Sequence, residues 1–433
     1  MSRRPRSTPK PPAPPLATLP VLRWAHGGDA VAMADDGPLA GLVVFVRGAV
    51  PGDVVRVAVE TKKKRWARAR LVAVERPSPE RRVPPCAVQA ACGGCPWMVG
   101  TREAQRASRE AILLGEVRKS LIPGLTSDED LAAKVRLVDV AGASEVGYRV
   151  RAKLAWRRGP SGAVAVGFMG KASHAFVPIP RCEVLTPALN DALPAIRRAL
   201  AAEAADRGEV TLVAGDEGVA AWVEPTPGPG HPVGPEQVTV RFGARPFTAS
   251  PRAFLQANAA VAGALVDRVE ALARELGGAH AVELFAGAGL FTTALWAAGF
   301  AVDAYEVDPA ARAGFEATRE RLGVPAERGR WHASDLLLSG VPSPRPAAPP
   351  DLVLLDPPRA GAAELVPWIR ASGARAVILV SCDVATAARD LALLAEGPEG
   401  FEVTRVDGYD MFPHTGHQEV LAVCVRRGVP TSS

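Results

Sequence analysis

The second half of the chain alternates short apolar runs with segments of helical character, and this alternation constrains the fold more than any other feature. From about Phe247 onward the apolar runs are Ala281–Leu284, Val302–Glu306, Leu352–Leu355 and Val377–Val380. Short buried strands separated by helices indicate a parallel sheet with helices on both faces. The sequence therefore predicts an α/β domain of the doubly wound, Rossmann-like kind over residues 246–433.

The chain before this domain divides into three parts. Residues 1–19 are rich in arginine and proline, which is the composition of a disordered basic tail. Residues 20–77 contain strand-like runs such as Val54–Val59 and predict a small barrel. Residues 78–245 combine a helical stretch, Arg102–Leu121, with further strand-like runs, and they predict a central α+β domain.

The barrel region carries a basic run, Lys62-Lys63-Lys64-Arg65, directly before Trp66. Cations beside an aromatic ring suit single-stranded RNA, because the cations meet phosphates and the ring stacks on a base. A solvated hairpin tip is the alternative interpretation of the same run.

Net charge and the distribution of apolar residues indicate the kind of partner and the cellular compartment to expect. The formal net charge of +5 fits a polyanionic partner, although many soluble proteins share it. No run of about eighteen apolar residues suggests a membrane span, and the N-terminal residues lack the apolar centre of a secretory signal. We therefore expect a cytoplasmic protein, in which clustered cysteines are more often metal ligands or catalysts than disulfides.

A glycine turn follows the first predicted strand of the α/β domain. Gly287 and Gly289 let the backbone approach a ligand closely, and Glu306 ends the next strand at the spacing of an acid that accepts ribose hydroxyls. The third glycine of the dinucleotide pattern is missing. The turn therefore favours a nucleoside cofactor without phosphates, such as S-adenosylmethionine, over a dinucleotide.

Asp356 closes another predicted strand and is followed by Pro357, Pro358 and Arg359. A carboxylate at the carboxyl end of a sheet strand faces the ligand crevice, and two prolines stiffen the loop after it. An Asp-Pro-Pro turn beside a glycine turn is typical of methyltransferases that act on nucleic-acid bases.

Cys382 lies at the end of a predicted buried strand, just before a helix that begins near Val384. The positive end of that helix is expected to lower the pKa of the thiol and favour the reactive thiolate. Cys424, inside the apolar run Val420–Val425, is interpreted instead as a core residue.

A thiolate beside a methyl donor fits methylation of uracil at C5. Addition of the thiolate to C6 makes C5 nucleophilic, and a base must later remove the C5 proton so that the cysteine can leave. Glu419, at the start of the last predicted strand, is the candidate base, and His414 and His417 compete with it on the grounds of their usual pKa.

A second group of cysteines has the spacing of metal ligands. Cys86, Cys92 and Cys95 are separated by five and two residues, and Cys182 follows at a distance. Three close cysteines with a remote fourth suit an iron–sulfur cluster, although four thiolates can also hold zinc.

Ordered motifs along most of the chain resemble the RNA 5-methyluridine methyltransferases, in the branch that carries an iron–sulfur cluster and a TRAM barrel. The motifs are the cysteine spacing, Tyr148-Arg149-Val150-Arg151-Ala152-Lys153, Phe254-Leu255-Gln256-Ala257-Asn258, the glycine turn, Asp356-Pro357-Pro358-Arg359, Ser381-Cys382-Asp383 and Asp410-Met411-Phe412-Pro413-His414-Thr415. In the barrel, Gly27–Val31, Phe45-Val46 and Pro51-Gly52-Asp53 resemble the TRAM domain, an OB-like RNA-binding fold.

The resemblance implies a role for each matching residue. Cys382 corresponds to the nucleophile and Glu419 to the proton acceptor. Gln256, Phe285, Glu306, Asp335 and Asp356 correspond to residues of the S-adenosyl-L-methionine site. Cys86, Cys92, Cys95 and Cys182 correspond to ligands of a 4Fe–4S cluster, for which we expect a structural or RNA-positioning role.

The sequence departs from the family pattern at three places. Leu290 replaces an asparagine that usually contacts the cofactor, Asp383-Val384 replaces Asn-Pro, and His414 replaces glutamine. The substrate expected from the resemblance is RNA, with 23S rRNA favoured over tRNA and no obligate protein partner evident. The alternatives are a methyltransferase for another base or for protein, an RNA-binding protein without catalysis, and an iron–sulfur redox protein.

Overall fold

The computed structural model describes residues 15–170 and 175–428. The chain forms two compact units, one made of residues up to 84 with 96–108, the other of 85–95 with 109–433. Of the predicted tail, residues 1–14 lie outside the described residues, and Leu16–Leu19 already belong to the first strand. In the described ranges, no helix is both long and apolar enough to cross a membrane.

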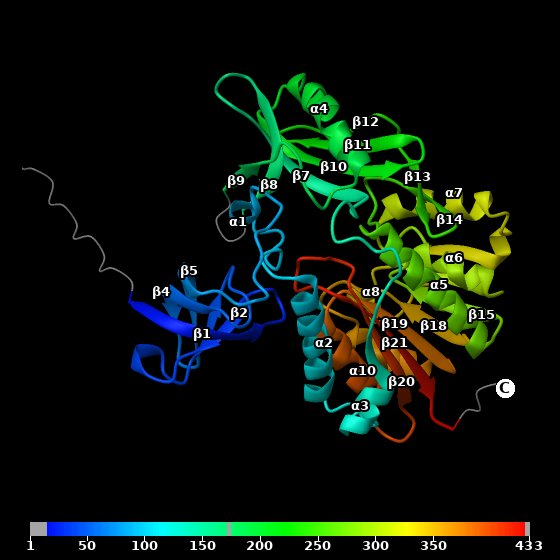
Figure 1. Ribbon diagram of the computed structural model, residues 1–433. Helices are drawn as coiled ribbons and strands as arrows, with labels where there is room; N and C mark the ends of the chain where they lie inside the picture. The colour runs from blue at the N-terminus through cyan, green and yellow to red at the C-terminus, as the bar shows by residue number, and fades with distance from the viewer. Residues whose placement is uncertain (1–14, 171–174, 429–433) are drawn as a thin grey trace, which may run out of the picture. The chain divides into compact units, whose positions relative to one another are not determined.

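The first unit contains the predicted small barrel (Figure 1). Its strands are β1 (Leu16–Trp24), β2 (Ala30–Met33), β3 (Val43–Val46), β4 (Val54–Lys62) and β5 (Trp66–Arg76), with a 3-10 turn at Gly37–Leu39 between β2 and β3. They close in the order β1-β2-β3-β5-β4, with β3 and β5 parallel. Val55 and Val57 are fully buried while Arg56 between them is exposed, which is the period of two expected of a barrel wall.

A six-stranded sheet forms the predicted central part. Its elements are β7 (Arg151–Arg158), β8 (Val164–Met169), β9 (Phe176–Pro178), α4 (Pro187–Ala201), β10 (Arg207–Gly215), β11 (Gly218–Pro225) and β12 (His231–Val233). The strands run in the order β12-β11-β10-β7-β8-β9 with antiparallel neighbours. Helix α4 covers one face through Leu189, Leu193 and Ile196, and it begins after Thr186, whose hydroxyl accepts a bond from the Leu189 amide.

The rest of the second unit is built around an eight-stranded sheet. Before it in the chain come α1 (Gln89–Cys92), α2 (Arg102–Lys119), α3 (Asp128–Lys134) and β6 (Val135–Val138). The first seven residues of α2, up to Ser108, belong to the first unit, and the rest of the helix belongs to the second. Further elements are β13 (Val238–Phe242), β14 (Arg245–Ala249), α5 (Ala259–Leu276), β15 (His280–Leu284), α6 (Leu290–Ala297), β16 (Ala301–Glu306), α7 (Pro309–Arg321), a 3-10 turn (Ala326–Arg328), β17 (Gly329–Ala333) and α8 (Leu336–Ser339). The last are β18 (Leu352–Leu355), a 3-10 turn (Ala363–Leu365), α9 (Val366–Ala371), β19 (Ala376–Ser381), α10 (Val384–Ala395), β20 (Phe401–Tyr409) and β21 (Glu419–Arg426).

The predicted strands of the α/β domain are β15, β16, β18 and β19, and they are parallel as expected. The full order is β17-β16-β15-β18-β19-β21-β20-β6. Beyond the four predicted strands the sheet is mixed, because β21 runs antiparallel to both β19 and β20. This reversal brings the start of β21 to the carboxyl end of β19.

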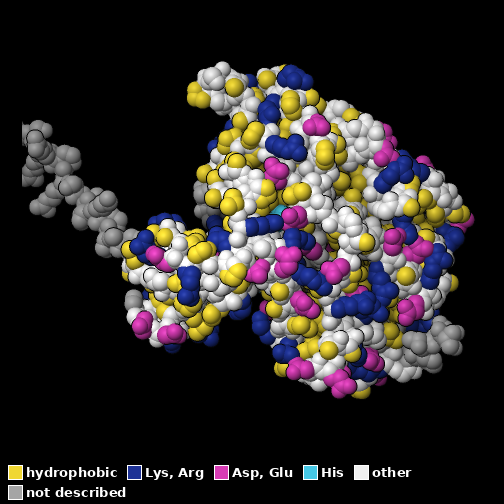
Figure 2. All heavy atoms as spheres, in the orientation of Figure 1, with side chains coloured by type: hydrophobic (Ala, Val, Ile, Leu, Met, Phe, Trp, Pro, Cys, Tyr) yellow, Lys and Arg dark blue, Asp and Glu magenta, His cyan; other side chains and the backbone are white. Residues whose placement is uncertain are grey.

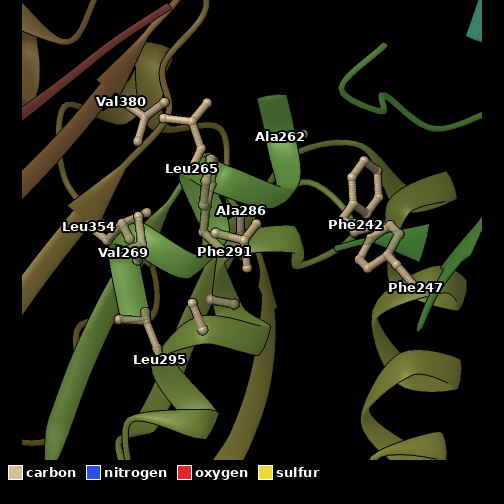
Figure 3. Packing of buried hydrophobic residues seen from close by; sticks show 14 of the residues in the cluster. Phe242, Phe247, Ala262, Leu265, Val269, Ala286, Phe291, Leu295, Leu354 and Val380 are labelled. Atoms are coloured by element: carbon tan, nitrogen blue, oxygen red, sulfur yellow. The ribbon is translucent and has the colours of Figure 1, made fainter. Parts of the chain in front are cut away.

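The expected boundary at residue 245 does not separate the elements of this sheet from those before it. Strand β6, which the sequence placed in the central domain, pairs in parallel with β20 at the sheet edge. The β13–β14 hairpin packs through Phe242 and Phe247 into the same apolar cluster as α5 and α6 (Figure 3). A four-residue strand with two polar or half-exposed positions carries too little pattern to show which sheet it joins.

Alternate residues of the central strands enter different apolar clusters on the two faces of the sheet. Ala281, Leu354 and Ile378 join Leu265 and Val269 of α5 in one cluster. On the other face, a second cluster joins the intervening strand residues to helices α2, α3, α9 and α10; it includes Val282, Val353, Val377, Leu113, Leu131, Ile369 and Leu391. Helices on both faces bury the strands completely, which explains their continuous apolar character in the sequence.

Asp303 of β16 carries a buried polar cluster on this sheet. Its carboxylate accepts bonds from Nε and Nη2 of Arg330, at 2.6 and 2.8 Å, and pairs with His280 Nε2 at 2.8 Å and His332 Nε2 at 2.9 Å. Burial opposes ionisation, but these partners outweigh it and hold the pKa of Asp303 well below its usual range.

We expect Asp303→Asn to lower the free energy of unfolding at pH 7 by about 2 kcal/mol, because an amide cannot accept from all of these donors. The depressed pKa makes this stabilisation complete above the unfolded value of about 3.9 and lost as pH falls below it. Urea midpoints at pH 7 and pH 3 measure both effects. Asp216→Asn, which removes an exposed pair with Arg241, is the matched control and should change stability by less than about 0.5 kcal/mol. Equal losses in the two variants would contradict the role of Asp303.

Candidate active site

The turn after β15 has a backbone that few residue types can adopt. Phe285, Gly287 and Gly289 have φ of 60°, 53° and 85°. A Cβ on Gly289 would lie 2.6 Å from the Phe315 ring, whereas a Cβ on Gly287 would meet no atom within 4 Å. Gly289 is therefore required by packing, and the open space beside Gly287 is available to a ligand. A non-glycine residue in the left-handed region, here Phe285, costs about 1–3 kcal/mol and is typical of ligand sites.

A pocket opens beside this turn. It is lined by Phe247, Phe254, Leu255, Gln256, Phe285, Ala286, Gly287, Ala288, Leu290, Phe291 and Asp356. Four residues predicted to bind the cofactor, Gln256, Phe285, Gly287 and Asp356, thus come together. Gly289 lies between two lining residues and begins α6. Leu290 presents an apolar side chain where the family usually has an amide.

Glu306 ties the end of β16 to the glycine turn. Its Oε2 accepts from the Gly287 amide at 2.9 Å, and its Oε1 accepts from the amides of Val307 and Asp308 at 2.7 and 2.8 Å. Each carboxylate oxygen has two lone pairs, so one or more remain for ligand hydroxyls. The other predicted cofactor acid, Asp335, is exposed and does not line this pocket; its carboxylate caps α8 through the Leu338 amide at 3.1 Å.

The acids around the pocket suppress one another's ionisation. Burial, together with the charge of Glu306, raises the pKa of Asp356 to about 7, although a hydrogen bond from Gln256 opposes the rise. Burial and the charge of Asp356 raise the pKa of Glu283 to about 8, against a hydrogen bond from Thr292. The pKa values of these buried carboxyls are raised, so a cationic ligand bound beside them would stabilise their ionised forms.

Cys382 follows the last residue of β19 and precedes α10, as the sequence predicted. The expectation of a lowered thiol pKa was wrong. Burial, and after it the charges of Glu419 and Asp356, raise the pKa of Cys382 to about 11, although Arg359 donates to the sulfur and opposes the rise. The helix end is weakened as a source of positive potential because Asp383 caps it, accepting from the Thr386 amide at 2.9 Å.

The departure from Asn-Pro at Asp383-Val384 has little effect on local structure. Aspartate and asparagine are about equally good N-cap residues, and Asp383 performs that function here. Proline at the first helical position is favourable but is not required, and Val384 is buried against the sheet.

Glu419 lies beside Cys382 through strand register. Ser381 pairs with Val420 across the antiparallel strands β19 and β21, so the next position on each strand is Cys382 and Glu419. Glu419 is fully buried, and in the described part of the chain neither of its carboxylate oxygens has a hydrogen-bond partner. Burial, with the charge of Asp356, raises the pKa of Glu419 well above its usual value. An unpaired buried carboxyl beside a thiol indicates a functional site rather than a structural one.

The two competing histidines occupy different positions. His414 is fully buried with φ of 69°, and its Nε2 lies 3.8 Å from Oε2 of Glu145. His417 is half-buried in the same loop. Among the charged groups that act on the Cys382 thiol, Glu419 has the largest effect, which favours the carboxylate as the base.

Comparison with known proteins identifies the family. A relative from Chromohalobacter salexigens, named 23S rRNA (uracil(1939)-C(5))-methyltransferase RlmD, is 32% identical over 96% of this chain and 91% of the relative. The protein of that name from Alkalilimnicola ehrlichii is also 32% identical, over 98% and 99% of the two chains. The chain belongs to the family of 23S rRNA (uracil-C5)-methyltransferases. No model in a scan of protein families matches the chain.

A solved structure supports the fold of this uracil-C5 methyltransferase family member. The Pyrococcus abyssi tRNA (uracil-54, C5)-methyltransferase, in complex with S-adenosyl-L-homocysteine, superposes with a TM-score of 0.70 at 22% identity. The match covers 94% of this chain and 99% of the other. At that identity the likeness shows a shared fold.

The sequence did not identify the residues that hold the loop at 410–418, which joins β20 to β21 in this methyltransferase. Arg109 of α2 bonds to Asp410 and to two backbone carbonyls of the loop. Asn258 donates to the Met411 carbonyl at 3.2 Å, and the Tyr148 hydroxyl donates to that of Pro413 at 3.3 Å. One signal was available for Arg109, since it shares an apolar helix face with Ile112 and Leu113 at the spacings i+3 and i+4.

The four predicted cluster cysteines lie in one unit and affect one another electrostatically. Burial, with the charges of Cys182, Cys92 and Cys86, raises the pKa of Cys95 to about 12. Asn190 fixes the backbone of Cys182 with two hydrogen bonds, at 2.9 and 3.0 Å. Within the described residues, no three histidine, cysteine or acidic side chains are positioned as a metal-binding group. Cys424 is a fully buried core residue, as interpreted from the sequence.

We expect Glu419→Gln to speed alkylation of Cys382 at pH 9 by about tenfold, the equivalent of one pKa unit, because a like charge is removed. Arg359→Gln should slow the same reaction, since the cation that favours the thiolate is lost. Peptide mass spectrometry after timed iodoacetamide treatment resolves each cysteine. Cys424, buried in the core, is the internal control and should stay unmodified. An unchanged rate at Cys382 in Glu419→Gln would show that the two groups do not interact.

Proposed function

We propose that this protein transfers a methyl group from S-adenosyl-L-methionine to carbon-5 of a uridine in 23S rRNA through a covalent adduct with Cys382. The observation that carries the proposal is the register of β19 and β21, which sets a half-buried thiol beside a buried, unpaired carboxyl. The family assignment supports the substrate, because the relatives are named for 23S rRNA. Methylation of tRNA uridine and RNA binding without catalysis are the alternatives.

The chemistry assigns one task to each group. The Cys382 thiolate adds to C6 of the uracil, and the electrons of the C5–C6 double bond make C5 nucleophilic. S-adenosyl-L-methionine, when bound, would supply an electrophilic methyl group, which passes to C5 as its bond to the sulfonium sulfur breaks and S-adenosyl-L-homocysteine leaves. The Glu419 carboxylate then takes the C5 proton, the double bond re-forms, and the sulfur leaves C6 as a thiolate.

The raised pKa values of Cys382 and Glu419 in the free protein make their ionisation depend on the bound cofactor. Cys382 and Glu419 each hold a proton more strongly than usual because they are buried among carboxyls. The cofactor brings a sulfonium cation, and a cation near Asp356 and Glu419 favours their ionised forms. Arg359, which already acts on Cys382, favours the thiolate. The ionised forms of Cys382 and Glu419 that the reaction requires are therefore favoured once the cationic cofactor is bound.

The barrel is proposed to be a TRAM-type RNA-binding module. Trp66 is 38% exposed and stands edge-on to Phe45, with ring centroids 6.3 Å apart. Arg68 and Arg70 follow it on β5 with exposed side chains. Figure 2 shows scattered Lys and Arg side chains among hydrophobic ones on the visible face of the barrel. Cations around an exposed ring suit a single RNA strand.

The adduct is tested with RNA that contains 5-fluorouridine, in which C5 has no removable proton. We expect the wild-type protein with cofactor to become covalently attached to this RNA on a denaturing gel, and Cys382→Ala to form no adduct. With unmodified RNA, Glu419→Gln should accumulate a methylated adduct and lower turnover by roughly 10²- to 10⁴-fold. A wild-type protein that methylates RNA but never forms the adduct would overturn the mechanism.

A 4Fe–4S cluster held by Cys86, Cys92, Cys95 and Cys182 is the second part of the proposal. Four thiolates are the donor set that such a cluster requires, and the charges of Cys86, Cys92 and Cys182 act on the Cys95 thiol and raise its pKa. Gln89 donates to the Cys95 carbonyl at 3.0 Å, and Gly93, with φ of 64°, ends α1 between two of the cysteines. The cluster would serve as a covalent brace between α1 and the loop before α4.

Metal analysis of protein purified without oxygen tests the cluster. We expect iron and acid-labile sulfide in the wild-type protein, and loss of most of both in Cys95→Ser, because one of four ligands is removed. Cys382→Ala is the matched control and should keep the full iron content. Stoichiometric zinc in place of iron would contradict the proposal.

A further inference from the structure

The loop at 410–418 lies between the end of β20 and the candidate base, Glu419, and its backbone is held chiefly by one side chain. Nη2 of Arg109 lies 2.9 Å from Asp410 Oδ1, 2.8 Å from the Thr415 carbonyl and 3.3 Å from the Phe412 carbonyl. Arg109 thus contacts the beginning, the middle and the second half of the loop. A planar guanidinium with several donors is suited to such multiple contacts.

The contact also extends from the loop back to helix α2. The side-chain amide of Gln418 donates to the Arg109 carbonyl at 3.3 Å, so the residue directly before Glu419 is bound to the same turn of the helix. Gly408, near the other end of the loop, packs so closely that an added Cβ would lie 2.8 Å from Leu113, one helical turn after Arg109. Both ends of the loop therefore rest on α2.

The burial of Arg109 limits the conformations that the loop can adopt. The Arg109 side chain is 1% exposed and that of Asp410 is 19% exposed. A buried guanidinium is retained in a fold where its charge is compensated, and here Asp410 and carbonyl oxygens compensate it. Asp410 and Arg109 consequently stabilise one conformation of the loop over alternatives.

We infer that Arg109 is a positioning residue for Glu419, and that it sets the rate of the final proton abstraction rather than of adduct formation. The inference rests on the proposed function. Cys382 lies between β19 and α10, outside the 410–418 loop that Arg109 contacts, so we expect the thiol to keep its position when these contacts are weakened. Glu419 begins β21, where it pairs with Tyr409 of β20, and it directly follows Gln418, so the loop constrains the end of the strand that carries this carboxyl.

Loss of the Arg109 contacts is expected to slow proton removal from C5 but not methyl transfer. With the base displaced, the C5–methyl bond still forms, but the C5 proton is removed slowly, so the C6–sulfur bond persists. A displacement of about 1 Å can lower a rate roughly 100-fold. We therefore expect Arg109→Lys, which keeps the charge but loses the planar set of donors, to lower turnover about 10- to 100-fold.

The experiment compares Arg109→Lys with Arg136→Lys on full-length protein, unmodified substrate RNA and radiolabelled S-adenosyl-L-methionine. Arg136 pairs with Asp407 of β20 at 2.8 Å, three residues before Asp410, and within the described residues its side-chain hydrogen bonds go to that carboxylate. Quenched samples on a denaturing gel measure the fraction of protein held as methylated adduct. Turnover is measured in parallel with uridine and with 5-deuterouridine RNA, and thermal unfolding checks both variants.

We expect Arg109→Lys to accumulate the methylated adduct and to show an increased deuterium isotope effect on turnover, and Arg136→Lys to show neither. Arg109→Gln, with no charge, should give the same pattern more strongly. A fall in turnover without adduct would overturn the inference, and so would unchanged turnover in a folded variant. A wild-type protein that forms no adduct with 5-fluorouridine RNA would instead overturn the proposed mechanism, which keeps the two failures distinct.

Discussion

The antiparallel course of β21 beside β19 is the constraint on which the site depends. In a wholly parallel sheet the first residue of a neighbouring strand lies at the amino edge, far from the ligand crevice. Because β21 is reversed, its first residue, Glu419, lies at the carboxyl edge next to Cys382. One reversed strand therefore brings the proposed nucleophile and the proposed base, from separate segments, to the edge of the sheet that also carries the glycine turn after β15.

Several acidic side chains lie together at this edge of the sheet, and few cations or hydrogen-bond donors of the protein stabilise their charges. Asp356 and Glu283 hold their protons to about pH 7 and pH 8, and the Glu419 carboxyl has no hydrogen-bond partner among the described residues. Such a site is costly for stability in the free protein. A bound cationic cofactor would reduce that cost, so the free energy of cofactor binding and the ionisation of these carboxyls are coupled.

The sequence predicted the features that depend on local pattern. The strands β15, β16, β18 and β19, the small barrel and the buried role of Cys424 all follow from apolar periodicity, and the structure contains them. The thiol pKa was predicted with the wrong sign, because a helix end is visible in the sequence whereas burial beside Glu419 and Asp356 is not. Strand β6 and the contacts of Arg109 depend on tertiary packing that one sequence cannot specify.

Arg149 connects the four cysteines at positions 86, 92, 95 and 182 with the loop at 410–418. Its guanidinium lies 5.4 Å from the centre of the Phe412 ring, inside the 410–418 loop, and its charge favours the thiolate forms of Cys95 and Cys182. Its backbone is fixed by the Val184 carbonyl and by Thr186, which follow Cys182. The cluster proposed at these cysteines would thereby hold Arg149 and stiffen the loop, a structural role that requires no electron transfer.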